Sequence, residues 1–209
     1  MRVTIVNLFY PPDLAPSAHL AASLAEHRAS LDDDVTVVCG TGAYLGGSER
    51  GARVLGGASG GPKVKRLWTP ALGKATTARR LGDYASFLVG AVARLAFLPR
   101  QDVVVALTSP PFVLVAAVVH RLLHPRTRVV LWSHDVYPDA AEAFGTIRPG
   151  GMLSRVLRAI ERGLLRRVDH VVAVDPAMLH RVLSGYARDG KPQGSVIPTW
   201  EPFALFPEG

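Results

Sequence analysis

The chain has 209 residues, of which 48% are hydrophobic and 20% charged, so it has enough apolar material for a sizeable core and is not intrinsically disordered. Its length favours one α/β domain over two small ones. The single cysteine, Cys39, excludes an internal disulfide framework and a cysteine-rich zinc site. A formal net charge of +7 indicates an anionic partner: a membrane surface, a phosphorylated small molecule or nucleic acid.

No segment of the sequence has the form of a spanning helix or a secretory signal. No apolar run reaches about 18 residues, the length that a spanning helix requires. At the N-terminus, Pro11 and Pro12 come before any apolar stretch long enough for a signal peptide. We therefore expect a cytoplasmic protein.

Short β-branched runs alternate with longer amphipathic segments along the chain. In chain order they predict a strand at 3–9, a helix at 18–28, a strand at 35–39, a glycine-rich loop at 40–61, a strand at 64–67, a helix at about 76–98, strands at 102–107 and 128–132, a helix at 153–167, and strands at 170–174 and 195–198. Ser109 and Asp175, each followed by proline, predict two further helix starts. This order predicts a Rossmann-like parallel sheet with helices on both faces, joined by right-handed crossovers.

Ligands of such open sheets bind beyond the carboxyl ends of the strands. Four predicted segments fall there: 10–13, 108–111, 133–138 and 175–176. His134 follows a buried strand beside an acid and an aromatic residue, where an imidazole can meet a polar ligand, so we expect it to be functional. Asp139 and Glu142, three residues apart, are predicted to form a capping box at the next helix.

The loop that enters the first predicted helix has two interpretations. Backbone N–H groups at the helix start can hold an anion or sugar hydroxyls. Alternatively, Ser17 only caps the helix and the prolines stiffen the turn. A metal site is not expected: His120 and His124 have a suitable helical spacing, but a third ligand is missing, so they are interpreted as a helix-end pair.

Basic residues are concentrated between Lys63 and Arg100, where Asp83 is the one acid. The predicted helix in this region has a broad apolar face, and Trp68 and Phe97 lie nearby in the sequence. The combination is typical of an interfacial membrane segment, or of a core helix with a solvated basic rim. For membrane docking, the candidate residues are Lys65, Arg66, Trp68, Lys74, Arg79 and Arg80.

A second stripe of arginines lies within the predicted helix at 153–167. Arg155, Arg158, Arg162 and Arg166 are spaced to share one outward face, opposite Val156, Leu157, Ile160 and Leu164. A solvated face is the default interpretation, and acidic lipid headgroups are the alternative. Nucleic acid is not expected, because no helix-turn-helix, zinc-finger or aromatic RNA-binding motif accompanies the charge.

Six motifs occur in order along the chain: Phe9-Tyr-Pro-Pro12, Val35-Thr-Val-Val38, Asp102-Val-Val-Val-Ala-Leu-Thr-Ser-Pro-Pro111, His134-Asp-Val-Tyr-Pro-Asp139, Val171-Val-Ala-Val-Asp-Pro-Ala-Met178 and Val196-Ile-Pro-Thr-Trp200. Together this ordered set resembles the N-terminal half of a family 4 retaining glycosyltransferase. The nearest resemblance is to bacterial enzymes that extend lipid-linked or exopolysaccharide sugars. It implies a two-domain GT-B architecture, in which the N-terminal half receives the acceptor and the C-terminal half binds the nucleotide-sugar.

The resemblance also implies roles for individual residues. His134 matches the family's active-site histidine, which contacts the donor sugar. The loop at 15–18 would contact the acceptor or the donor phosphate, with Pro16-Ser17 in place of the relatives' glycine pair. The substrate-binding candidates are Tyr10, Pro16, Ser17, Ser109, Asp135, Tyr137 and Asp139. No metal and no cofactor are expected, because the nucleotide-sugar is a substrate.

The whole chain, 1–209, is expected to form one such N-terminal domain, with 199–209 as the start of a linker to a donor-binding domain in cis or on a separate chain. Alone it should be inactive, since a single half cannot surround the reacting carbon. It is expected to work at the inner face of the membrane. The alternative is a non-catalytic membrane-docking subunit that recruits a catalytic chain; an oxidoreductase is excluded because the first βα turn has no glycine fingerprint.

Overall fold

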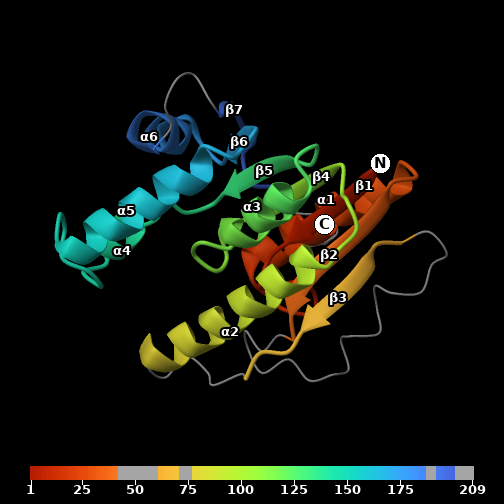
Figure 1. The fold of residues 1–209 in the computed structure, drawn as a ribbon, viewed down its shortest axis with the longest axis horizontal. Helices are drawn as coiled ribbons and strands as arrows, with labels where there is room; N and C mark the ends of the chain where they lie inside the picture. The colour runs from red at the N-terminus through yellow and green to blue at the C-terminus, as the bar shows by residue number, and fades with distance from the viewer. Residues whose placement is uncertain (42–60, 71–76, 187–191, 201–209) are drawn as a thin grey trace, which may run out of the picture.

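The computed structural model describes residues 1–41, 61–70, 77–186 and 192–200 (Figure 1). Its centre is a seven-stranded sheet in the order β3-β2-β1-β4-β5-β6-β7, and every neighbouring pair is parallel. The strands are β1 (Arg2–Val6), β2 (Asp34–Gly40), β3 (Lys63–Leu67), β4 (Val103–Leu107), β5 (Arg128–Ser133), β6 (His170–Ala173) and β7 (Gln193–Val196). The predicted Rossmann-like parallel sheet is confirmed.

Helices cover both faces of the sheet, as predicted, but unequally. They are α1 (Pro16–Ser30), α2 (Thr77–Ala96), α3 (Leu114–Leu123), α4 (Asp139–Ala143), α5 (Met152–Leu165) and α6 (Pro176–Tyr186). One buried cluster joins β-strand side chains such as Val104 and Leu131 to α2, α3, α5 and α6. The opposite faces of the same strands pack, through Ile5 and Leu107, against α1. Strands buried on both faces explain the continuous apolar runs in the sequence.

The apolar side of α2 belongs to the core. Phe87, Ala91 and Leu95 are fully buried in the cluster shared with α3 and the sheet. His120 of α3 joins the same contact, since its Nδ1 donates to the Leu95 carbonyl and its Nε2 accepts from the Gln101 N–H. His120 lies in the last turn of α3 and His124 is the residue that caps it, so the interpretation of the two histidines as a helix-end pair agrees with the structure.

The start of α3 differs from the prediction. A helix was expected from Ser109, but α3 begins at Leu114. Phe112 has a φ of +63°, in the left-handed region, so the backbone cannot run helically through it. The prolines at 110 and 111 therefore belong to a turn that precedes the helix.

Candidate functional site

Three loops meet at the carboxyl edge of the central strands. The Leu8 N–H after β1 donates to the Ser109 carbonyl after β4, at 2.7 Å. The hydroxyl of Thr108 accepts hydrogen bonds from the backbone N–H groups of His134 and Asp135, at 3.1 and 3.2 Å. Thr108 lies in the predicted segment 108–111 but was not among the individual site candidates; it fixes the loop that carries the candidate histidine. The predicted segments after β1, β4 and β5 are brought together as expected from the topology.

His134 presents a buried ring nitrogen that has no partner. Its Nε2 makes no hydrogen bond within the described part of the chain, although the atom is removed from solvent. Burial lowers the pKa of His134 below its usual range, and the neighbouring Asp135 carboxylate opposes this only in part. The imidazole is therefore neutral near pH 7. A buried, unsatisfied polar atom in a native structure is costly unless a ligand or water completes it.

An open pocket adjoins His134. It has a volume of about 550 Å³ and lies between the β5–α4 loop, α4 and α6, where Asp135, Asp139, Met178 and Arg181 are among the lining residues. Pockets for small ligands usually measure about 300–1,000 Å³. A second hollow, beneath α5 and lined by Phe112, has only about 20 Å³ and admits little more than one water molecule. Of these two hollows in the described part of the chain, the pocket beside His134 has room for a sugar.

The predicted capping box is wrong. The cap of α4 is Pro138, with no side-chain hydrogen bond to the helix start. Instead, Asp139 pairs with Arg158 of α5 and Arg181 of α6, both at 2.5 Å, and accepts a hydrogen bond from the Tyr186 hydroxyl. Glu142 pairs with the same Arg158 guanidinium at 2.6 Å and accepts from Ser154. The two carboxylates bind α4 to α5 and α6 because charged partners at short range outcompete backbone N–H groups.

The Asp139 contacts also show in its acidity. Burial raises the pKa of Asp139, but hydrogen bonds from Arg181, Tyr186 and Arg158 outweigh burial and hold the pKa below its ordinary value. Both carboxylate oxygens are already engaged, so in this arrangement Asp139 shapes the wall of the pocket. The prediction that Arg158 stands on an outward face with the other α5 arginines is wrong for the same reason.

Tyr137 links the β5–α4 loop to α2. Burial, followed by the nearby Asp135 and Tyr84, raises the pKa of Tyr137, while Arg80 lowers it. Arg80 of α2 is therefore close enough to this loop to act on it electrostatically. The side chain of Asp135 is exposed at the mouth of the site.

The structure contradicts one of the two interpretations of the first loop, the one in which Ser17 caps the helix. The helix α1 begins at Pro16, after Ala15, and has no side-chain cap, so Ser17 does not cap it. Pro16 is exposed and Ser17 is buried. Tyr10 is buried within the core beneath α1, and burial raises the pKa of its phenol to about 12. Its hydroxyl has no hydrogen-bond partner among the described residues.

Trp200 is a site neighbour whose role the sequence did not suggest. Its ring stacks on Trp132 with centroids 5.4 Å apart, and Trp132 in turn lies 5.3 Å from the ring of His134. The Trp200 indole N–H donates to the Ser23 hydroxyl of α1. The segment after β7 thus crosses back to α1 and packs behind the histidine. The one sequence signal for this role is that Trp200 ends the last of the family-like motifs.

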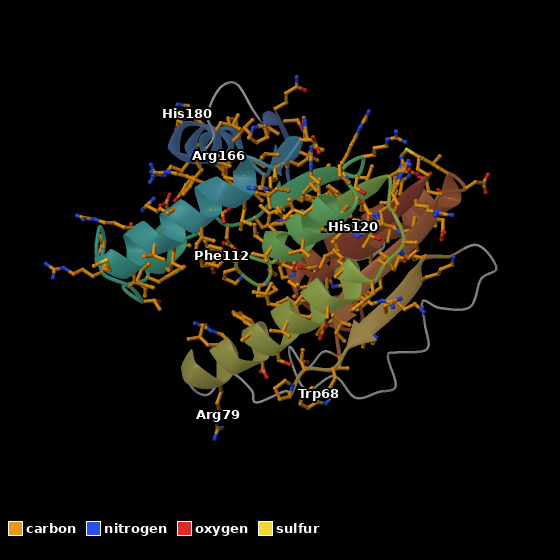
Figure 2. All side chains as sticks on the ribbon, viewed as in Figure 1. Trp68, Arg79, Phe112, His120, Arg166 and His180 are labelled. Atoms are coloured by element: carbon orange, nitrogen blue, oxygen red, sulfur yellow. The ribbon has the colours of Figure 1, made fainter. Side chains whose placement is uncertain are left out.

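The described docking candidates lie in the edge strand β3, directly after it, and at the start of α2. Lys65 and Trp68 are exposed, and Figure 2 shows Trp68 and Arg79 pointing away from the body of the molecule. Arg66 is tied to the first loop, because its guanidinium donates to the carbonyls of Pro11 and Gly40. Lys74 and most of the glycine-rich loop at 40–61 lie outside the described residues, as do residues 201–209 of the predicted linker. None of the described helices has the length and apolar character of a membrane-spanning segment.

Comparison with known proteins places this site in a family. No curated protein matches the chain significantly. A family model does, and residues 17–193 match the glycosyl transferase 4-like domain. The match runs from the first turn of α1 to the first residue of β7, so it includes the His134 loop and all the lining residues of the adjacent pocket. Since it covers most of the chain, the chain belongs to the glycosyl transferase 4-like domain family.

Proposed function

We propose that the chain is the acceptor-binding half of a retaining GT-B glycosyltransferase. It would move a sugar from a nucleotide-sugar to a glycan or lipid-linked acceptor, in a pathway of polysaccharide biosynthesis. The observation that carries the proposal is the buried, unpartnered Nε2 of His134 beside an open pocket at the carboxyl edge of the sheet. Membership of the glycosyl transferase 4-like family supports glycosyl transfer as the reaction class.

The neutral imidazole of His134 suits a hydrogen-bonding role better than that of a fixed cation. Because its pKa is lowered, it donates or accepts a single hydrogen bond to a sugar hydroxyl near the anomeric carbon. In the proposed step, the bond from the anomeric carbon to the nucleotide phosphate breaks. The acceptor oxygen bonds to the same face of that carbon, and its proton passes to the departing phosphate. The proposed step uses the nucleotide-sugar as a substrate and requires no metal and no cofactor.

The rest of the site has assigned parts in the proposal. Asp135 orients the acceptor at the mouth of the pocket, Tyr137 contributes to acceptor binding from the same β5–α4 loop, and Asp139 keeps the α4 wall in place. The α1 start at Pro16 and Ser17, with Ser109, contributes backbone groups to substrate hydroxyls or phosphate. Tyr10 supports this loop from the core. The donor-binding half is supplied in cis or by a second chain, and this chain alone is expected to transfer no sugar.

The enzyme is further proposed to act at an anionic membrane surface, reached from the cytoplasmic side. The supporting features are the net charge of +7 and the exposed basic and aromatic residues at Lys65, Trp68, Arg79 and Arg80. A non-catalytic docking subunit is the second candidate function. The observation that favours it is that α5 exposes large apolar side chains, such as Met152 and Val156, together with arginines.

Replacing His134 with alanine tests the catalytic proposal. With the donor-binding half present, His134→Ala should lower the rate of sugar transfer at least about 100-fold. The control is His180→Ala, which removes an exposed histidine of α6 and should leave the rate unchanged. Thermal unfolding and vesicle co-sedimentation of both variants should match the parent chain. Unchanged transfer by His134→Ala would remove this residue from the mechanism, and a docking-only subunit would show no loss in either variant.

A further inference from the structure

Helix α5 has two sides of opposite character. Its inner side carries Ser154, Arg158 and Leu165, which contact α4, α6 and the core. Its outer side carries Met152, 82% exposed, together with Leu153, Val156 and Ile160, all of them exposed. Phe144, directly after α4, is 85% exposed. We call these five residues the outer apolar side chains of α5. Clustered large apolar side chains of this kind mark interaction sites.

The charged residues around α5 are also distributed unequally between its two sides. Between residues 139 and 167 the sequence has six arginines and three acids. Asp139 and Glu142 are engaged by Arg158, and Glu161 faces the small hollow beneath α5. Arg155, Arg162 and Arg166 are exposed and, at spacings of seven and four residues, share one side of the helix beside the outer apolar side chains (Figure 2 labels Arg166). The outer side is therefore apolar and cationic, and none of the three acids lies on it.

This combination fits an anionic bilayer better than a free anionic solute. The headgroup boundary offers hydrocarbon for Phe144, Met152 and Val156, and phosphates at a slightly higher level for the arginines. A soluble anion would satisfy the arginines but would leave the apolar residues in water. The N-terminal ends of α5 and α2 project beyond the carboxyl ends of the strands (Figure 1), so docking there leaves the sheet edge with His134 close to the lipid surface.

We propose that the outer side of α5, with Phe144, is the surface by which this chain docks on a bilayer containing anionic lipid. Its five apolar side chains enter the headgroup layer, and Arg155, Arg162 and Arg166 bind phosphates. The proposal rests on the membrane part of the proposed function and moves its main contact from the 65–80 region to α5. Docking is measured without sugar transfer, so the docking proposal and the proposed transferase function can fail separately.

The single cysteine makes a direct test possible. Cys39 is fully buried, so a new cysteine on the surface is the one site that an environment-sensitive fluorophore can label in the folded chain. Val156→Cys places the label on the outer side of α5. Val89→Cys is the matched control, because Val89 is an exposed valine of α2. The label at 156 should shift to shorter wavelength with vesicles of phosphatidylcholine and phosphatidylglycerol at low salt. It should not shift with phosphatidylcholine alone, and the label at 89 should not shift with either.

Vesicle co-sedimentation then separates the contributions. Replacing Arg155, Arg162 and Arg166 together with glutamine should weaken binding to the anionic vesicles about 100-fold. Met152→Ser with Val156→Ser should also weaken it and leave the midpoint of thermal unfolding unchanged. The inference is overturned if the arginine variant binds like the parent, or if Lys65→Gln with Trp68→Ser abolishes binding while the α5 variants retain it. It is also overturned if the α5 variants instead dissociate a dimer in solution. Loss of transfer in His134→Ala with normal docking concerns the proposed function alone.

Discussion

Helices α2 and α5 have the same type of sequence and opposite relations to the core. Both are amphipathic, and both carry arginines along one side. In α2 the apolar side is buried: Phe87, Ala91 and Leu95 are inaccessible to solvent. In α5 the side with Met152 and Val156 faces outward, while Arg158 points inward to Asp139 and Glu142. The helical period is a property of the sequence alone, but the side that faces the core depends on the neighbouring elements.

The neighbours explain the difference. α2 packs against both α3 and the sheet, where apolar side chains from three elements interlock. α5 lies farther from the sheet and touches the core mainly through Leu165 and the partly buried Leu164. Its orientation is fixed by one arginine that meets two carboxylates of α4. Polar contacts with α4, rather than apolar burial, thus decide which side of α5 faces the core.

The largest expected effect compares one apolar residue from each helix. Phe87→Ala in α2 should lower the free energy of unfolding by about 3–5 kcal/mol, because it empties a fully buried site. Val156→Ala in α5 should change it by less than about 0.5 kcal/mol, since this side chain is already exposed. Urea unfolding of both variants measures the difference. Similar losses in the two variants would mean that the outer side of α5 is packed in solution.

The next effect tests the arginine that turns α5. Arg158→Met should lower the free energy of unfolding by about 2 kcal/mol, because Asp139 loses a charged hydrogen bond in a partly buried place. Arg155→Met is the matched control on the exposed side and should have almost no effect. Equal effects of the two replacements would contradict the inward role of Arg158.

The same variant has a pH signature. The pKa of Asp139 is below its ordinary value of 3.8 in the folded chain, so its stabilisation is complete above about pH 4 and is lost as the pH falls through the folded-state pKa. Arg158→Met should therefore unfold with a shallower dependence on acid than the parent chain. Urea midpoints measured between about pH 5 and pH 2 would check this slope.

The strands and the position of the site at the carboxyl edge of the sheet were predictable from the sequence, but the partners that individual side chains contact were not. Apolar β-branched runs, such as the one at 102–107, have few structural alternatives, and parallel topology then brings the loops after β1, β4 and β5 together. The capping box failed because local spacing cannot reveal that Arg158 and Arg181 compete for Asp139. Trp200 was missed because its partners Trp132 and Ser23 are far from it in the sequence.

The smallest expected effect probes the inner side of α5 at Glu161. Burial raises the pKa of Glu161 to about 7, and no charge among the described residues brings it back. A raised pKa means that the neutral carboxyl fits the fold, so the contribution of Glu161 is favourable below its ordinary pKa of 4.5 and is lost as the pH rises through about 7. Glu161→Gln should therefore unfold like the parent near pH 4 and should be more stable by about 1–2 kcal/mol near pH 8. Urea unfolding at both pH values measures this. If the two chains differed in stability by the same amount at both pH values, water would reach the carboxylate and α5 would stand away from the hollow. If they differed only at high pH, the inner side of α5 would exclude an unpaired charge and accept only the paired Arg158. That exclusion would keep the apolar side of α5 outward.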